Sequence, residues 1–193
     1  DGYIYDILGD YTFKISPMSF YQVNPTQAEA LYNIAIEEAN LSKDDILFDL
    51  YCGIGTIGIF ASSYVKKVYG IEIVKQAIED AKENAKINNI ENIEFYAGDV
   101  EKIFGNLMEK KQVYPDVIIV DPPRKGLDNN TINNILAVKP KKIVYISCNP
   151  ATMVRDMKLL SENYEIGNIQ PVDMFPFTSH VECVTVLYAK ETL

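Results

Sequence analysis

The chain has 193 residues, 48% of them hydrophobic, which is enough for one domain with a sizeable buried core. Its apolar runs stay below the ~18 residues of a membrane span, and its start lacks the basic segment of a signal peptide, so we expect a cytoplasmic protein without a membrane partner. The net charge of −9 disfavours a domain that binds nucleic acid through phosphate contacts alone.

The first segments predict a β-hairpin followed by a helix. Apolar and polar residues alternate over residues 3–8 and 11–15 around Gly9, which is typical of two antiparallel strands joined by a tight turn. After Pro25, apolar residues recur at helical spacing as far as Leu41. We expect the hairpin to belong to a preceding domain.

From residue 46 onward, strand and helix patterns alternate. Short β-branched runs predict buried parallel strands at residues 46–50, 67–72, 92–97, 117–120 and 142–146. The clearest helix between them covers residues 74–88. Two further extended runs, 164–172 and 181–189, should close the sheet with an antiparallel pair. The pattern predicts an α/β fold with a doubly wound, mostly parallel, seven-stranded sheet, and ligands that bind at the carboxyl ends of its strands.

A glycine-rich turn follows the first strand of this sheet. Residues 49–58 match the pattern G-x-G-x-x-G, starting at Gly53 and Gly55, and Glu72 ends the next strand where a ribose-binding acid belongs. Such a turn serves both NAD and S-adenosylmethionine. Asp49 favours the methyl donor, because a carboxylate suits a cationic amino acid group and repels a pyrophosphate. A nicotinamide-dependent oxidoreductase stays open as an alternative.

A second motif, Asp121-Pro122-Pro123-Arg124, directly follows a predicted strand at the same edge. The two prolines stiffen the turn and present the Asp121 carboxylate in a fixed geometry. A similar D-P-P in enzymes that methylate exocyclic amino groups is followed by an aromatic residue, whereas Arg124 stands here. Amino-methylation of adenine or cytosine is therefore a second alternative.

A cysteine stands at the end of the predicted strand 142–146, in the run S-C-N-P, where Pro150 suits the first turn of a helix. A helix N-terminus next to Cys148 predicts a lowered thiol pKa. The other cysteines, Cys52 and Cys183, are far away in sequence and form no C-x-x-C pair, so we expect three free thiols, without a disulfide framework or a metal site.

With these motifs, the sequence resembles the uracil-5 RNA methyltransferases, which form 5-methyluridine in ribosomal or transfer RNA. Five pieces occur in the family's order, namely Phe20-Tyr21-Gln22-Val23-Asn24, Leu50-Tyr51-Cys52-Gly53-Ile54-Gly55, Asp121-Pro122-Pro123-Arg124, Ser147-Cys148-Asn149-Pro150 and His180-Val181-Glu182. The resemblance implies a Rossmann-like class I methyltransferase fold. Residues 20–193 are then the S-adenosylmethionine-dependent domain, and residues 1–19 a hairpin that ends a preceding central domain.

The resemblance also implies a reaction: transfer of a methyl group from S-adenosylmethionine to C5 of a uridine, with 23S rRNA expected first and tRNA second, and S-adenosylhomocysteine as product. Cys148 would be the nucleophile that adds to C6, and Glu182 the base. The histidine of the last motif, His180, would orient or pack. Family members carry further RNA-binding domains, so we expect additional RNA contacts from such regions, and a cofactor-binding module without activity of its own is a further alternative.

The cofactor-binding residues expected from the glycine turn and the resemblance are Gln22, Asp49, Tyr51, Gly53, Gly55, Glu72, Asp99 and Asp121. Arg124 is the expected substrate contact, holding a carbonyl oxygen of the base or a phosphate. The competing interpretations are structural. Arg124 would instead form a salt bridge, Cys148 would be a small buried apolar residue, and Glu182 would lie on the surface of an edge strand.

Overall fold

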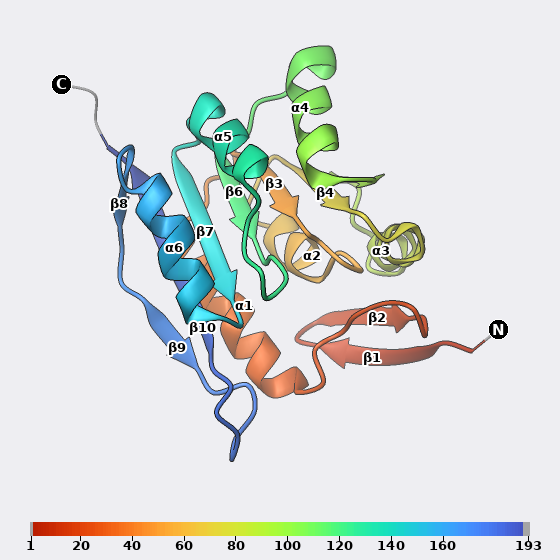
Figure 1. The fold of residues 1–193 in the computed structure, drawn as a ribbon. Helices are drawn as coiled ribbons and strands as arrows, with labels where there is room; N and C mark the ends of the chain where they lie inside the picture. Colours follow the sequence, from red (N-terminus) through yellow and green to blue (C-terminus); the bar gives the residue numbers. More distant parts are fainter. Residues whose placement is uncertain (1, 191–193) are drawn as a thin grey trace.

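The computed structural model describes residues 2–190 (Figure 1). Asp1 and residues 191–193, the outer ends of the two predicted domains, lie outside the described residues. The elements follow one another in the order β1 (Ile4–Leu8), β2 (Tyr11–Ile15), α1 (Pro25–Ala39), β3 (Ile46–Leu50), α2 (Thr56–Ser62), β4 (Lys67–Glu72), α3 (Lys75–Ile87), β5 (Ile93–Ala97), α4 (Val100–Lys111), β6 (Val117–Val120), α5 (Asn129–Val138), β7 (Lys142–Ser147), α6 (Pro150–Leu160), β8 (Tyr164–Ile166), β9 (Gln170–Val172) and β10 (Glu182–Ala189). No helix among residues 2–190 combines the length and apolarity needed to cross a bilayer.

The central sheet has the strand order β5-β4-β3-β6-β7-β10-β8, with β9 also paired to β10. Strands β3 to β7 pair in parallel, and β10 runs antiparallel to β7. This confirms the predicted α/β fold with a mostly parallel, doubly wound sheet.

One edge of the sheet differs in detail from the expectation of seven strands, because β8 and β9 share the outermost position beside β10 and raise the count to eight. The predicted single run 164–172 is interrupted near Gly167, whose backbone N–H donates to Val186 O at 2.9 Å. A Cβ atom at Gly167 would lie 2.7 Å from that same oxygen. The close approach of the two backbones requires a glycine and interrupts the edge strand.

Helices cover both faces of the sheet (Figure 1). Apolar residues of α1 and α2 share one core cluster with Leu47 and Val144, whereas α4, α5 and α6 share another with Phe48 and Tyr145. Successive strand residues point to opposite faces, so a strand covered on both sides reads as a continuous apolar run. This burial explains why the strands were visible in the sequence.

The N-terminal hairpin packs on the domain formed by the later residues. Leu8 and Phe13 are buried in the same core cluster as α1. Asp80 and Asn84 of α3 and its C-cap residue Asn88 are spaced by four and therefore lie on one face, where they bond to β2 and the residue after it. The bonds run from Thr12 N to Asn88 Oδ1 (2.9 Å), from Lys14 N to Asn84 Oδ1 (2.7 Å) and from Ser16 Oγ to Asp80 Oδ1 (2.8 Å).

Candidate active site

The predicted site residues gather where the parallel strands end. Leu50 of β3 pairs with Ile71 of β4 and with Val120 of β6, so the residues that follow these three strands meet at one edge of the sheet. The antiparallel pair β7–β10 ends with Ser147 opposite Cys183. Cys148 is the next residue after β7, and Glu182 is the first residue of β10, so one more pair in the same register would set them opposite each other. Directly opposed residues on neighbouring strands have Cβ atoms about 5 Å apart.

The glycine turn after β3 leaves its backbone open. Gly53 and Gly55 have φ angles of +53° and +83°, in the left-handed region that glycine adopts without strain. A Cβ atom at Gly53 would meet no atom within 4 Å, whereas one at Gly55 would lie 2.7 Å from the Phe95 ring. The Gly53 N–H donates to Glu72 Oε2 at 3.2 Å. The turn therefore combines free space with an adjacent carboxylate, as a ribose-binding site requires.

Asp49 lies beneath this turn with no solvent exposure. Its Oδ2 accepts a 2.8 Å hydrogen bond from Gly58 N, and its Oδ1 has no partner among the described residues. Burial raises the pKa of Asp49 to about 8. A buried carboxylate oxygen without a donor is stabilised by a cationic group, so this position suits the positive end of a ligand.

Acidic groups surround the predicted nucleophile. Burial, together with the charge of Glu182, raises the pKa of Asp121 to about 7. Glu182 is only 4% exposed, and this burial raises its pKa. The positive charge of Arg124 offsets part of the rise. These shared effects indicate that the side chains following β6 and beginning β10 lie near one another.

The pKa of Cys148 is raised, which contradicts the expected lowering by the helix N-terminus. The causes are burial first, then the charges of Glu182 and Asp121, which outweigh the lowering effect of Arg124. The sequence prediction considered only the helix that follows Cys148, and the carboxylates come from other strands. The raised pKa favours the thiol form of Cys148 over the thiolate.

Hydrogen bonds connect the Cys148 turn to the D-P-P-R turn. Asn149 caps α6, accepting from Ala151 N at 3.2 Å, and its Nδ2 donates to Arg124 O at 3.0 Å. The Thr152 hydroxyl donates to the same carbonyl oxygen at 3.2 Å. The Arg124 guanidinium itself is exposed and forms no ion pair within residues 2–190. The two turns are thus joined through the Arg124 carbonyl oxygen, and the arginine head group makes no ion pair among these residues.

The remaining predicted residues form no hydrogen bond to the cysteine turn among the described residues. Gln22 is buried in the loop after β2, and Asp99 is the exposed N-cap residue of α4. Tyr51 donates to Asp128 Oδ2 at 3.4 Å, and burial raises its pKa to about 12, with a contribution from the charge of Asp99. His180 is exposed, and its ring lies 6.3 Å from that of Phe175. No hydrogen bond among the described residues joins the Gln22 or Asp99 side chain to the cysteine turn.

Sequence reasoning missed one residue that faces these carboxylates. Tyr32 of α1 is buried, and its pKa is raised well above the ordinary value by burial and by the charges of Asp121 and Asp49. The expected apolar face of this helix omitted Tyr32. A tyrosine on the buried face of a helix was the available signal, since a buried phenol hydroxyl usually has a polar neighbour.

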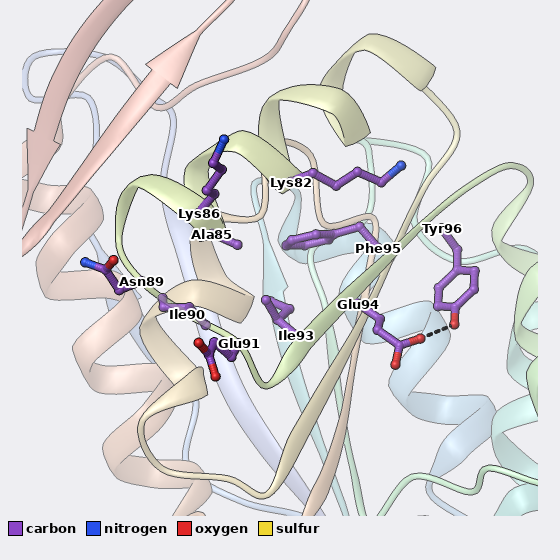
Figure 2. Close-up of a pocket in the computed structure, with 10 residues that line it drawn as sticks. All are labelled: Lys82, Ala85, Lys86, Asn89, Ile90, Glu91, Ile93, Glu94, Phe95 and Tyr96. Atoms are coloured by element: carbon purple, nitrogen blue, oxygen red, sulfur yellow. Dashed lines mark hydrogen bonds between the residues drawn. The ribbon is translucent and has the colours of Figure 1, made fainter.

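A separate groove of about 590 Å³ lies between α3 and the edge strand β5 (Figure 2). Lys82 and Lys86 stand on its helical side, and Ile93 and Phe95 point into it, while Glu94 and Tyr96 point to the other side of the strand (Figure 2). None of the predicted site residues lines this groove. The candidate site is therefore the strand edge described above.

Comparison with known proteins identifies the family of this chain. A family model described as tRNA (uracil-5-)-methyltransferase matches residues 7–190. An RNA methyltransferase from Oceanobacillus iheyensis is 54% identical over 191 residues, covering 98% of this chain and 41% of the relative. One from Staphylococcus aureus is 52% identical over 188 residues, covering 97% of this chain and 41% of the relative. The chain thus spans about two fifths of the length of these relatives.

Solved structures show the same similarity. The tRNA (uracil-54, C5)-methyltransferase of Pyrococcus abyssi, in complex with S-adenosyl-L-homocysteine, is 37% identical and aligns with a TM-score of 0.81 over 97% of this chain and 44% of its own. The tRNA m1G37 methyltransferase of M. jannaschii is 17% identical, with a TM-score of 0.73 over 98% of this chain and 57% of its own, and so shares the fold. Because the family model covers almost the whole chain, this protein belongs to the tRNA (uracil-5-)-methyltransferase family.

Proposed function

We propose that this chain transfers a methyl group from S-adenosylmethionine to C5 of a uridine in RNA, with Cys148 as nucleophile and Glu182 as base. The observation that supports the proposal is the β7–β10 register, which pairs Ser147, just before Cys148, with Cys183, just after Glu182, at the strand edge that also holds the glycine turn. A nucleophile, a base and a cofactor turn on one edge are what this reaction requires.

The residues at the glycine turn fit the cofactor. The unpartnered Asp49 Oδ1 suits the cationic amino acid end, and the Glu72 carboxylate suits the ribose hydroxyls. The backbone of Gly53 would allow close approach of the cofactor, whereas Gly55 makes room for the Phe95 ring behind the turn. The proposed binding set is completed by Gln22, Tyr51, Asp99 and Asp121. This set favours the methyl donor over NAD, because a cationic amino acid group would stabilise the buried Asp49 carboxylate and a pyrophosphate would not.

The proposed chemistry begins with the Cys148 thiolate, because uracil C5 alone is a weak nucleophile. Addition of the sulfur to C6 breaks the C5–C6 double bond and moves its electron pair into an enolate that makes C5 nucleophilic. When bound, S-adenosylmethionine supplies the electrophilic methyl group and leaves as S-adenosylhomocysteine. Glu182 then removes the C5 proton, the C5–C6 double bond re-forms, and the Cys148 thiolate is expelled.

The electrostatics of the site support the role of Glu182 as base, whereas the raised pKa of Cys148 opposes formation of its thiolate. A raised pKa makes Glu182 a better proton acceptor at neutral pH than an ordinary carboxylate. The charge of Arg124 offsets part of the rise in the Cys148 pKa and would thus assist formation of the thiolate. With its head group exposed, Arg124 is also the proposed contact to a uracil carbonyl or a phosphate.

The proposed substrate is RNA, and either 23S rRNA or tRNA supplies the same uracil chemistry. The Pyrococcus abyssi relative is described as a tRNA methyltransferase, and the description of the family model also names tRNA. We also propose that residues 20–193 form the methyltransferase domain and that residues 1–19 connect it to a further RNA-binding region, as the greater length of the relatives suggests. Such a region would compensate for the acidic charge of this domain.

The test compares Cys148→Ala with Cys183→Ala, a buried cysteine on the neighbouring strand. Methyl incorporation from labelled S-adenosylmethionine into 23S rRNA and tRNA transcripts is measured, and the modified nucleoside is identified. We expect Cys148→Ala to abolish 5-methyluridine formation, while both variants bind S-adenosylhomocysteine with unchanged affinity by calorimetry. Normal C5 methylation by Cys148→Ala would refute covalent catalysis, and a methyl group on an exocyclic nitrogen would support amino-methylation instead.

A further inference from the structure

Two loops beside the candidate site carry the most exposed large apolar side chains of residues 2–190. These are Met18 (76% exposed), Phe20 (73%), Val23 (79%) and Phe177 (107%), and we call them the apolar rim. A 3.1 Å hydrogen bond from Asn24 Nδ2 to Met174 O holds the two loops side by side, where the β9–β10 loop meets the start of α1 (Figure 1). Exposed apolar side chains that gather in one place indicate a contact surface.

The backbone of Phe177 is held in an unusual conformation. Its φ angle is +70°, in the left-handed region that a residue with a Cβ atom rarely adopts. Two hydrogen bonds across Phe177 hold the turn. Thr178 N donates to Phe175 O at 3.1 Å, and Thr178 Oγ1 donates to the same oxygen at 2.7 Å. The turn thus leaves the Phe177 ring fully exposed to solvent. Strain of this kind tends to occur where a ligand is bound.

Each of the two loops of the rim is continuous in the chain with a predicted site residue. The loop that carries Phe177 leads directly into Glu182 at the start of β10, and the loop that carries Phe20 also contains the buried Gln22. A nucleotide next to a uridine held between Cys148 and Glu182 would therefore come within reach of these loops.

The charge of the chain indicates which chemistry this surface can use. A net charge of −9, with Asp121 and Glu182 at the site, gives little attraction for phosphate groups. An aromatic ring binds an unpaired base by stacking, which needs no cation and tolerates different bases. We propose that Phe177 is a stacking platform for an unpaired RNA base adjacent to the target uridine, with the rest of the apolar rim beside it. This inference rests on the proposed function, because it assumes a uridine bound at Cys148.

The absence of tryptophan from the sequence allows a direct test. Phe177→Trp introduces a single tryptophan, whose fluorescence is measured while the transcript that the wild-type protein methylates, tRNA or 23S rRNA, is added. We expect saturable quenching, since a stacked base quenches indole emission. The matched control is Tyr114→Trp. Tyr114 is 57% exposed and lies before the start of β6, whereas the D-P-P-R turn of the candidate site follows the end of that strand, so this variant should show no quenching.

A second measurement separates stacking from a structural role. Phe177→Ala should bind the same transcript about 5- to 150-fold more weakly, the range expected for one stacked base. Its affinity for S-adenosylhomocysteine should be unchanged, and the ratio to wild type should not depend on salt. Equal RNA affinity of Phe177→Ala and wild type would overturn the inference while leaving C5 methylation intact. The inference would also be overturned if the Phe177→Trp variant already showed the emission of a buried indole before RNA is added, because another part of the protein would then cover the rim.

Discussion

The hydroxyl of Tyr145, on β7, donates a 2.7 Å hydrogen bond to Oδ2 of Asp156, which is fully buried on α6. The same oxygen accepts from Leu127 N at 2.8 Å, and Oδ1 accepts from Arg155 Nε at 2.8 Å. Arg155 Nη2 in turn donates to Lys125 O at 2.9 Å. The segment that follows the D-P-P-R turn is therefore fastened to the helix that follows Cys148.

We expect Asp156→Asn to lower the free energy of unfolding by about 2–4 kcal/mol, because the amide cannot replace a charged acceptor of several hydrogen bonds in a buried position. For a chain of this size the melting temperature should fall by about 5–10 °C. Tyr145→Phe removes only one of the donors and should cost about half as much. Thermal unfolding of both variants tests this, and a melting temperature of Asp156→Asn equal to that of wild type would contradict it.

Glu182→Gln should separate the two halves of the proposed reaction. Without the base, the C5 proton remains and Cys148 cannot be expelled, so a covalent protein–RNA complex should accumulate while turnover falls about 10²- to 10⁴-fold. The complex is detected by denaturing electrophoresis with labelled RNA. The control is Glu165→Gln, an exposed acid on β8. If Glu182→Gln turns over normally and traps no RNA, Glu182 is not the base.

The raised pKa of Asp49 predicts a pH dependence of stability. Its folded pKa of about 8 exceeds the value near 3.9 of an unfolded chain, so the folded state binds the extra proton between these limits. Stability from this group is greatest on the acid side and is lost as pH rises toward 8. Asp121, with a pKa of about 7, acts in the same direction.

Asp49→Asn should therefore flatten the profile of melting temperature against pH between about pH 5 and 8.5. The surface variant Asp10→Asn, in the hairpin turn, should keep the wild-type slope. Melting curves of the ligand-free protein across this range provide the measurement. An Asp49→Asn profile as steep as that of wild type would show that the carboxylate is ionised throughout.

Two glycines inside helices offer a matched pair. A Cβ atom at Gly58 would lie 2.9 Å from Asp49 Oδ2 and 3.2 Å from Val68, whereas one at Gly105 would meet nothing within 4 Å. Overpacking costs ~1–3 kcal/mol, which exceeds the ~1 kcal/mol that alanine gains over glycine in a helix. Gly58→Ala should thus destabilise by about 1 kcal/mol and weaken binding of S-adenosylmethionine.

Gly105→Ala should instead stabilise the protein by about 0.5–1 kcal/mol, since only the helix propensity changes. Denaturant unfolding compares the two variants. Equal stabilities for both would mean that the space around Gly58 adapts without displacing Asp49.

The sequence by itself determined the elements whose signals are local. Buried strands read as apolar runs, so the predicted ranges 46–50, 67–72 and 117–120 coincide with β3, β4 and β6. The glycine turn and the helix start at Pro150 were equally visible, because glycine permits and proline restricts backbone conformations at their own positions. The order of strand and helix then predicted the edge at which the motifs meet.

Only the tertiary structure decided what depends on residues far apart in the chain. The pKa of Cys148 rises because carboxylates arrive from β6 and β10, and the sequence shows only the helix beside it. The anchor at Asp156 joins residues 29 positions apart, and the bond from Thr12 to Asn88 joins residues 76 apart. Burial and charge are sums over spatial neighbours, and these neighbours are defined only once the sheet has assembled.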